Sequence, residues 1–501
     1  MGSQIKKIII FGGGTSGWLT AAYMTKNLTN STEICLIEDT SSGPIGVGEG
    51  TQPLTAQFLY RCGIEPRHWM KPSNASFKYG VELSGWNKDP YFVDNDNVNN
   101  YFPSKSLSVG KYFYNRPIQE YFDWYPAYKL AKNNRSPKLS SDKDVNFSID
   151  LDSYGAVHFS AYDIIETIKH VILDKITYVD VKISDVESDE KGISKLIAGK
   201  EVYTADLYLD CSGFSSLLLE KTLDSEFIPY SKWLLCDSAV AMPTKYNDAK
   251  KECHPYTKAT TMKAGWRWTI PTYNRVGNGY VYSSRFIDGE QAELELRETL
   301  RDFETPVKHI KMKCGTHKEV AKKNVCGVGL SSGFIEPLEA TGITFTTSIV
   351  EYITARLNMS NSNWTSEIVE STNRCFYEMS IEIFTFVWVH YHFSSRKDTR
   401  FWKEVRRQKI EDLPIDAKYV LSQYYPDPKN FMFFSDQSMF SSMQWFSILH
   451  AGGAYKNAKK NLSADEEKYI KYFMNTQDRR VALANELFPN HHDFLSQWYS
   501  E

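Results

Sequence analysis

A glycine-rich turn near the N-terminus restricts the possible folds of this chain more than any other feature. Residues 7–11 (KIIIF) form a short apolar run typical of a buried strand, and Gly12-Gly13-Gly14-Thr15-Ser16-Gly17 follow directly. A helical pattern then covers residues 18–28. In this G-x-G-x-x-G order, Gly12 permits a tight turn, Gly14 lets a pyrophosphate approach the backbone, and Gly17 lets the helix pack closely on the strand. The amides of Thr15 and Ser16 would start a helix able to bind phosphate groups.

A second strand is predicted over residues 33–37, and it ends at Glu38, which follows Gly17 by 21 residues. A carboxylate at this place suits a ribose hydroxyl pair and disfavours a 2′-phosphate. The pattern therefore favours FAD or NAD over NADP. The structural alternative is a glycine turn inside an ordinary α/β domain that binds no dinucleotide.

Later glycine-rich segments favour FAD over NAD. Residues 46–53 (GVGEGTQP), with Gly48 and Glu49 as candidate cofactor-binding residues, are too polar for a core strand. Residues 206–214 and 327–342 each read as a strand followed by a turn of small residues. Several such turns spread along the chain suit an extended cofactor. Since no second G-x-G-x-x-G is found for NADPH, a separate source of reducing power is expected.

Composition excludes several classes of function. The chain has 501 residues, a formal net charge of −3 and 24 % charged residues, so it lacks the basic footprint of a nucleic-acid-binding protein. No apolar run is long enough for a transmembrane helix, and the N-terminus does not have the layout of a signal peptide. The eight cysteines have no zinc spacing, no metal site is expected, and a reduced cytoplasmic protein is predicted. The basic run over residues 403–409 is interpreted as a solvated helix face.

Aromatic residues are unusually frequent at 14 %. Such a density of rings provides either extra core volume or the walls of a site for flat ligands.

Four segments and one longer block carry a resemblance to a known family. They are GGGTSGW (residues 12–18), GVGEGT (46–51), WRWTIP (266–271), FIEPLEATGI (334–343) and HYHFSSRKDTRFW (390–402). Together they resemble the flavin-dependent tryptophan halogenases, over residues 7 to about 453. The W-x-W-x-I-P segment discriminates best, because the wider FAD monooxygenases share the N-terminal pattern but are not expected to have it.

The resemblance implies a reaction and its partners. A separate flavin reductase supplies FADH2, oxygen adds to give a flavin hydroperoxide, and a halide ion attacks its distal oxygen to give hypohalous acid. This oxidant passes through the protein to a second pocket, where it halogenates an aromatic carbon.

Lys78, in Phe77-Lys78-Tyr79-Gly80, occupies the position of the essential lysine of the family. An amine can hydrogen-bond hypohalous acid or carry the halogen as a haloamine, and the sequence leaves both forms open. Burial among rings would favour the neutral amine. The alternative is an ordinary surface lysine.

Glu339 matches the active-site glutamate of the family. A carboxylate can stabilise the cation formed by halogen attack and accept its proton, whereas the structural alternative is an acid favoured by a helix dipole. Thr341 and Gly342 match the halide site, and Leu330 and Ile343 match residues that flank the FAD. Ala340 departs from the serine common in the family, which leaves a hydrogen bond near Glu339 in doubt.

The bulky segment of Trp266, Trp268, Ile270 and Pro271 resembles a wall beside the flavin. Such a wall would keep an organic substrate from the flavin hydroperoxide and suppress direct hydroxylation. Without the resemblance, the same residues would be an ordinary amphipathic strand.

The substrate pocket is where the chain departs most from the family. Phe102 aligns with one residue of the ring sandwich, and Asn100 stands in place of a histidine. Ser435 replaces the glutamate that binds the amino group, and Met439 and Phe440 replace a phenylalanine and a tryptophan. Loss of a polar clamp removes strong discrimination. Simple indoles or phenols are therefore expected over free tryptophan, and bromide or iodide over chloride.

The fold expected is α/β, with a GR2-type, Rossmann-like FAD-binding box and a mostly helical cap (pyramid) domain. The box covers residues 1–95 and 150–360, and the cap covers 96–149 and 361–501. From about residue 361 the pattern is helical and aromatic, ending with segments 465–474 and 478–487, and an oligomer is compatible with the sequence. The alternative functions are an FAD-dependent aromatic hydroxylase and a flavin-binding protein without turnover.

Overall fold

The computed structural model describes residues 3–41, 49–94, 106–137, 155–426, 438–458 and 462–500. The predicted site residues Gly48, Phe102 and Ser435 lie outside these ranges. The chain forms two compact units. Unit 1 comprises Met1–Asn74, Phe159–Lys232 and Met312–Ser380, and unit 2 comprises Ala75–His158, Trp233–Lys311 and Ile381–Glu501. This division groups residues 75–94 and 233–311 with the C-terminal helices, whereas the predicted box contained them; the assignment of box and cap remains a prediction.

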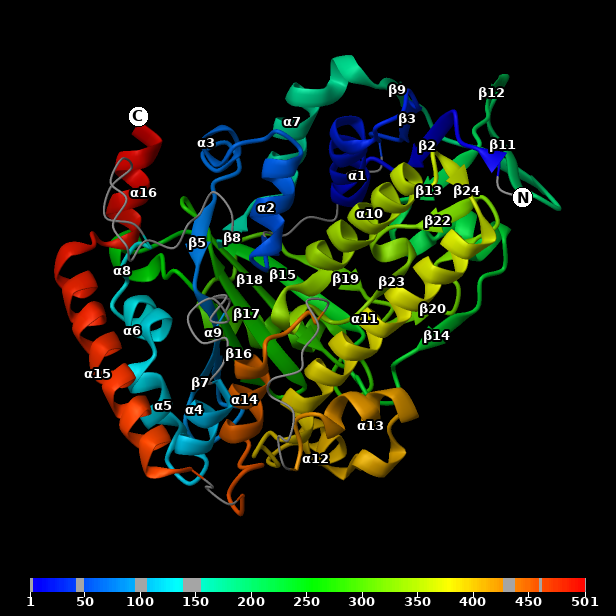
Figure 1. The fold of residues 1–501 in the computed structure, drawn as a ribbon. Helices are drawn as coiled ribbons and strands as arrows, with labels where there is room; N and C mark the ends of the chain where they lie inside the picture. The colour runs from blue at the N-terminus through cyan, green and yellow to red at the C-terminus, as the bar shows by residue number, and fades with distance from the viewer. Residues whose placement is uncertain are drawn as a thin grey trace. The chain divides into compact units, whose positions relative to one another are not determined.

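Unit 1 is built on a mostly parallel six-stranded sheet with the order β21-β22-β13-β2-β3-β9. Its strands are β2 (Lys7–Phe11), β3 (Glu33–Glu38), β9 (Thr177–Asp180), β13 (Leu207–Asp210), β21 (Ala321–Lys322) and β22 (Val325–Gly327). Ile8, Ile9 and Ile10 are completely buried, as expected for a parallel strand covered on both faces. Helix α1 (Thr15–Asn27) follows β2 and lies between α7 (Ala161–Ile172) and α10 (Thr341–Met359) (Figure 1).

Smaller elements complete unit 1. They are β1 (Ser3–Gln4), β4 (Glu49–Gly50), β10 (Asp185–Asp189), β11 (Gly192–Ala198), β12 (Glu201–Tyr203), β14 (Phe227–Pro229), β20 (Gly315–His317), β23 (Gly333–Phe334), β24 (Asn363–Trp364), α2 (Leu54–Arg61), α3 (Pro66–Trp69), η2 (Leu173–Lys175), η3 (Gly213–Ser215), η4 (Leu217–Thr222), η5 (Gly329–Ser331) and η6 (Pro337–Glu339). The turns η5 and η6 precede α10, so the predicted order of strand, small-residue turn and helix over 327–342 is present.

Unit 2 contains a seven-stranded sheet with the order β19-β15-β18-β17-β16-β6-β7. Its strands are β6 (Gly80–Ser84), β7 (Tyr91–Asp94), β15 (Ser238–Thr244), β16 (Thr257–Met262), β17 (Gly265–Pro271), β18 (Val276–Tyr282) and β19 (Lys308–Lys311). All neighbours are antiparallel except β16 and β6. Outside this sheet, β5 (Ser76–Lys78) pairs antiparallel with β8 (Ala156–Phe159) as the edge strand of a three-stranded sheet.

Helices make up most of the rest of unit 2. They are α4 (Ser106–Phe113), α5 (Ile118–Trp124), α6 (Pro126–Lys132), α8 (Ala249–Glu252), α9 (Gly289–Leu300), α12 (Arg400–Arg407), η7 (Ile410–Asp412), α13 (Ile415–Ser422), α14 (Ser442–Ala451), α15 (Ala464–Leu487) and α16 (His491–Ser500). Helix α11 (Ser366–His392) begins in unit 1 and ends in unit 2. Helix α15 packs along α4, α5 and α6 (Figure 1).

The helical segments predicted over 465–474 and 478–487 belong to one helix, because α15 is continuous from Ala464 to Leu487. Neither glycine nor proline occurs there, and the Thr476 hydroxyl donates to the Tyr472 carbonyl at 3.0 Å within the helix. Asn475 is exposed and Gln477 is buried, and neither residue ends the helix.

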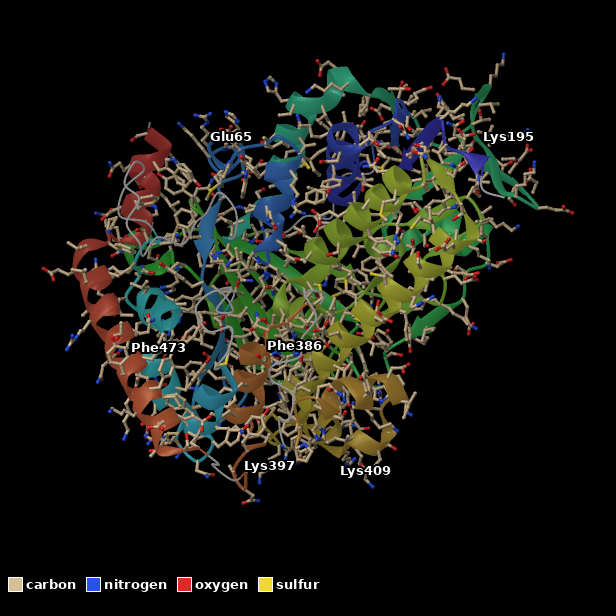
Figure 2. The ribbon with its side chains drawn as sticks, in the orientation of Figure 1. Glu65, Lys195, Phe386, Lys397, Lys409 and Phe473 are labelled. Atoms are coloured by element: carbon tan, nitrogen blue, oxygen red, sulfur yellow. The ribbon has the colours of Figure 1, made fainter. Side chains whose placement is uncertain are left out.

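Side chains separate as expected between surface and interior. Lys397 and Lys409 are exposed, whereas Phe386 is completely buried (Figure 2). In the described part of the chain, no helix combines the length and apolar character needed to cross a membrane.

Candidate active site

The glycine turn of unit 1 has the backbone geometry that its sequence predicts. Gly12 has φ of +118°, and a Cβ there would lie 2.3 Å from the Cys211 carbonyl oxygen. A Cβ on Gly17 would lie 1.9 Å from the carbonyl oxygen of Gly12. Both positions require glycine, because the Cβ of any other residue would overlap a carbonyl oxygen.

Gly14 differs from its neighbours because the space beside it is open. A Cβ built there meets no atom within 4 Å, and Gly14 precedes the first turn of α1 without any side-chain cap. Unsatisfied amides at a helix start are suited to bind phosphate oxygens. Thr15 and Ser16 open this helix, so the residues fit the pyrophosphate of a dinucleotide.

Glu38 ends β3, and its carboxylate lies over Gly13. Its oxygens accept hydrogen bonds from Tyr178 Oη at 2.7 Å and Trp18 Nε1 at 3.4 Å, and the Lys169 ammonium is 3.5 Å away. The side chain is only 7 % exposed. A carboxylate has more acceptor sites than these donors fill, so it remains able to accept a ribose hydroxyl group.

A second turn lies against the start of α1. Gly329 in η5 has φ of +72°, and a Cβ there would lie 2.0 Å from Ser16 Oγ. Ser16 Oγ is 3.5 Å from Thr346 Oγ1 on α10. Leu330, predicted to flank the FAD, is half-buried in the same turn. The structure thus brings Ser16, Leu330 and the first part of α10 together.

Glu339 is completely buried at the end of η6. Gln52 Nε2 donates to the Glu339 carbonyl at 2.6 Å, which ties this turn to the segment that follows β4. Burial raises the pKa of Glu49, on β4, to about 7. Ala340, which follows Glu339 in the chain, has φ of +55°, a left-handed conformation uncommon for a residue with a side chain.

Helix α10 starts directly after this strained residue. Thr341 is 2 % exposed, whereas Gly342 is exposed and a Cβ there would meet no atom within 4 Å. The start of α10 is therefore open at Gly342 and buried at Thr341. Ile343 is 7 % exposed and packs inward.

Lys78 lies in unit 2 at the end of β5 and is 4 % exposed. Its neighbour across the strand pair is Ala156, and Ser76 faces His158. Burial, and then the charge of Lys78, lower the pKa of His158 well below its usual value. The Ser76 hydroxyl donates to the carbonyl of Pro271, so β5 is bound to the end of β17.

The predicted aromatic wall occupies β17. Trp266 and Trp268 are 1 % and 6 % exposed, with ring centroids 6.4 Å apart, and Ile270 and Pro271 are also buried. Trp268 faces Gly279 on β18, where a Cβ would lie 2.0 Å from the Trp268 ring. Gly279 therefore makes room for the indole.

Of the predicted substrate residues, Met439 and Phe440 are described. Their amides donate to the Glu382 carboxylate of α11 at 3.0 and 3.3 Å. The Phe440 ring stacks on Phe386 with centroids 3.6 Å apart, so one ring face is covered by protein. Burial raises the pKa of Glu382.

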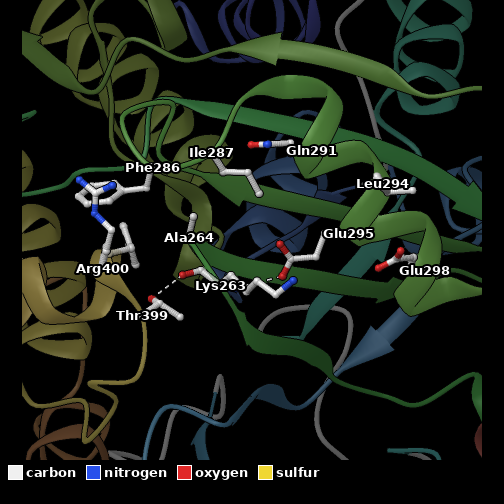
Figure 3. Close-up of a pocket in the computed structure, with 11 residues that line it drawn as sticks. Lys263, Ala264, Phe286, Ile287, Gln291, Leu294, Glu295, Glu298, Thr399 and Arg400 are labelled. Carbon is white, nitrogen blue, oxygen red and sulfur yellow. Dashed lines mark hydrogen bonds between the residues drawn. The ribbon is translucent and has the colours of Figure 1, made fainter.

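A surface cavity of about 500 Å³ in unit 2 contains none of the predicted site residues (Figure 3). It is lined by Lys263, Ala264, Phe286, Ile287, Gln291, Leu294, Glu295, Glu298, Thr399, Arg400 and Phe401. In the part of the chain that the structure describes, no cluster of three or more His, Cys, Asp or Glu residues could hold a metal ion.

Sequence reasoning missed Ser76, His158, His491 and Glu382. A single acid within the apolar part of a helix could have indicated Glu382. The two histidines carry no comparable signal, because their partners are distant in the sequence.

Comparison with known proteins identifies the family. The model of the family described as tryptophan halogenase matches residues 7–467. The chain is 32 % identical to the tryptophan 7-halogenase RebH of Lentzea aerocolonigenes, covering 99 % of both chains.

The chain belongs to the tryptophan halogenase family.

Solved structures agree with this assignment. The tryptophan 6-halogenase SttH of Streptomyces toxytricini superposes with a TM-score of 0.87 at 26 % identity, covering 99 % of this chain and 100 % of SttH. Tar14, a tryptophan C-6 flavin-dependent halogenase, gives a TM-score of 0.87 at 27 % identity, covering 99 % and 100 %.

Family membership confirms the resemblance and the α/β fold class with a Rossmann-like part and a helical part. The protein is an enzyme, a flavin-dependent halogenase, that uses FAD and halide to halogenate aromatic compounds.

Proposed function

We propose that the protein takes FADH2 from a separate flavin reductase and uses O2 and a halide ion, bromide or iodide in preference to chloride, to halogenate a simple indole or phenol. The observation that supports this most is the burial of Lys78, at the family's lysine position, on a strand bonded to the end of the Trp266–Pro271 wall.

Cofactor binding is assigned to unit 1. The open backbone at Gly14 and the start of α1 would hold the pyrophosphate, and Glu38 the ribose. Glu49, Leu330 and Ile343 would lie along the rest of the cofactor. When bound, FADH2 would supply two of the four electrons that reduce O2, and the halide ion would supply the other two as it is oxidised to hypohalous acid, with water as the second product.

Halide binding is assigned to the amides of Thr341 and Gly342. These amides start a helix, and the exposed backbone of Gly342 leaves room for an anion. Backbone donors at a helix start favour negative charge without supplying a competing carboxylate.

Lys78 is the group to which we assign the electrophilic halogen. Its Nζ either hydrogen-bonds hypohalous acid or carries the halogen as a haloamine. In both cases the halogen forms a bond to a ring carbon, while its bond to oxygen or nitrogen breaks. Buried surroundings strengthen these interactions and exclude water that would divert the halogen.

Glu339 is the carboxylate to which we assign the proton released by the ring. A negative charge stabilises the cationic ring intermediate before the proton leaves. The complete burial of Glu339 is consistent with this role, because an electrostatic interaction is stronger where water is excluded.

The wall formed by Trp266, Trp268, Ile270 and Pro271 separates this proposal from the hydroxylase alternative. These buried bulky side chains would keep an organic substrate away from the cofactor, whereas an aromatic hydroxylase needs that contact to transfer oxygen to the ring. We therefore assign to the wall the suppression of direct hydroxylation.

The test is a reaction with the purified protein, FAD, a flavin reductase, NADH, O2, bromide and indole, analysed by mass spectrometry. A brominated indole is expected. A hydroxylated indole without bromination would support the hydroxylase, and bound FAD without either product would support a flavin-binding protein without turnover.

Substrate and halide preference follow from competition in the same reaction. Indole or phenol should be consumed ahead of free tryptophan, because the polar clamp expected at residue 435 is a serine. Bromide should compete successfully with an equal concentration of chloride. A clear preference for chloride and tryptophan would contradict the proposed substrate class.

A further inference from the structure

The strand that carries Lys78 has one edge without a strand partner. Among the described strands, β5 pairs only with β8. The register pairs Ser76, Phe77 and Lys78 with residues 158, 157 and 156 of β8, and at the other edge the Tyr79 amide donates to the Pro255 carbonyl at 2.7 Å. An unpaired edge is free to shift or to bind another chain unless other groups cover it.

The C-terminal helix α16 satisfies this edge with side chains. The Phe77 amide donates to His491 Nε2 at 3.1 Å. At the other end of the helix, the Tyr499 hydroxyl donates to the Ala75 carbonyl at 2.7 Å. These bonds flank the short strand and are buried.

Ring packing strengthens the same contact. The Phe77 ring lies 5.6 Å from the ring of His491, 5.8 Å from Phe494 and 5.8 Å from Trp498, measured between centroids. Phe77 is 2 % exposed. Because successive side chains of a strand point to opposite faces, Phe77 anchors β5 to α16 while Lys78 projects from the other face.

The hydrogen bonds of His491 fix the tautomer of its imidazole. Its Nδ1 lies 2.8 Å from the Cys253 carbonyl, which can only accept, so Nδ1 carries the proton and Nε2 is free to accept from Phe77. Burial lowers the pKa of His491 to about 4, so the ring stays neutral at physiological pH. The imidazole therefore connects the segment that follows α8 to β5.

The opposite face of β5 is fixed to the aromatic wall. Ser76 shares this face with Lys78, lies 3.2 Å from His158 Nδ1, and donates to the carbonyl of Pro271. His158 is held in turn by Thr257 Oγ1 at 2.8 Å from its Nε2. The position of Lys78 thus depends on bonds at one edge of β5 and on the face that Ser76 shares with Lys78.

We propose that α16 is a positioning element for halogen transfer, in which His491 holds the Phe77 amide so that the neighbouring Lys78 amine stays aligned with the aromatic substrate. This inference rests on the proposed role of Lys78. Helix α16 lies beyond residue 467, where the match to the family model ends.

Removing the bond between the Phe77 amide and His491 is expected to uncouple halogenation from O2 consumption, so that less brominated indole forms per O2 consumed. In the holoenzyme, His491→Leu removes the acceptor while keeping a side chain of similar bulk. FAD binding and O2 consumption should stay within about twofold of the wild-type protein, because the assigned cofactor residues belong to unit 1. Brominated indole formed per O2 should fall about tenfold or more, since a displacement of about 1 Å at a reacting group can cost about a hundredfold in rate.

Free hypobromous acid should rise correspondingly, measured with a soluble β-diketone trap. This readout separates positioning from a merely structural role, because a loosened fold would lower FAD binding, O2 consumption and bromination together.

Matched variants complete the experiment. His491→Gln keeps an acceptor for the Phe77 amide and should restore most of the coupling. His492→Leu makes the same change at the next residue, whose half-buried ring stacks on Tyr273, and should couple normally. Tyr499→Phe, which removes only a hydroxyl group, provides a second probe of the same edge if His491→Leu does not fold, and it should show the same shift from product to free hypobromous acid.

The inference is overturned if every folded variant of this edge brominates indole with wild-type coupling, or if coupling is kept while FAD binding and O2 consumption are lost. Lys78→Ala distinguishes the two proposals. Should that variant brominate normally, the role of Lys78 fails; should it lose bromination while His491→Leu does not, only the positioning role fails.

Discussion

Ala340 has a strained backbone conformation next to the candidate halide site. Its φ of +55° lies in the left-handed region, where a Cβ clashes with the following carbonyl group and costs about 1–2 kcal/mol. This residue joins buried Glu339 to the start of α10. The strained turn therefore sets the direction in which the amides of Thr341 and Gly342 point.

Replacing Ala340 with glycine should relieve the strain. Ala340→Gly is expected to raise the free energy of unfolding by about 0.5–1 kcal/mol, after subtraction of the greater freedom of glycine in the unfolded chain. Urea unfolding measures this change. The control is Ala482→Gly at an exposed position inside α15, which should lower stability by about 1 kcal/mol. Equal losses in both variants would contradict the strain at residue 340.

Residue-scale prediction from sequence succeeded where a motif dictates backbone geometry. Gly12, Gly14 and Gly17 have the steric environments that G-x-G-x-x-G predicts. It did not find His491, because the bond from Phe77 joins residues 414 positions apart and no local pattern records it.

At the scale of elements, the turn between β2 and α1 contains one glycine that the fold itself requires and another that leaves open space for a cofactor. Gly12 has no room for a Cβ, whereas Gly14 has open space and φ of −73°, a value that any residue adopts. The two glycines should therefore respond differently to the same substitution.

Gly14→Ala should leave the stability of the apoprotein within about 0.5 kcal/mol of wild type, because the change creates no clash in the fold. Its affinity for FAD should fall tenfold or more, since the new methyl group stands where the pyrophosphate approaches. Thermal unfolding and FAD fluorescence titration measure the two quantities. Gly12→Ala, by contrast, should lower stability. Wild-type FAD affinity in Gly14→Ala would contradict the assigned cofactor site.

Element prediction was strongest for strands next to glycine turns and weakest for long polar helices. The strand predicted over 33–37 is present as β3, and residues 266–271, whose alternative interpretation was an amphipathic strand, lie in β17. Asn475 and Thr476 have weak helix propensity, but they lie inside the single helix α15, which joins the segments predicted over 465–474 and 478–487. Tertiary packing against α4, α5 and α6 outweighs this weak local preference.

At the scale of the whole molecule, buried histidines make stability depend on pH. Burial lowers the pKa of His254, His392, His450 and His491 to about 4. The unfolded chain binds protons near the ordinary histidine pKa of about 6.5, and the folded protein does not. Stability from these groups is therefore present above about pH 6.5 and is lost as the pH falls toward 4. Glu49, whose pKa is raised to about 7, acts in the opposite direction.

A single substitution can isolate one of these contributions. In the wild-type protein, the lowered pKa of His450 should make the free energy of unfolding about 3 kcal/mol smaller at pH 4 than at pH 7. His450→Gln should lack this loss. Urea unfolding at both pH values measures the difference. His68→Gln, at an exposed position, is the control and should keep the wild-type dependence. An unchanged dependence in His450→Gln would contradict the assigned cause.

The aromatic richness of the chain also belongs to this scale. Part of it fills the core, as in the stacked pair Phe386 and Phe440, and part forms the wall at Trp266 and Trp268. The composition predicted that the aromatic residues provide either core volume or the walls of a site. It could not show which residues do which, because that depends on packing between segments distant in the sequence.

The role assigned to Lys78 is tested by bromination of indole by Lys78→Ala in the complete reaction. The variant should bind FAD, consume O2 and release hypobromous acid to a trap, but form no brominated indole. Lys258→Ala, at a half-buried lysine on β16 of the same unit, should brominate normally. Bromination by Lys78→Ala at the wild-type rate would contradict the account.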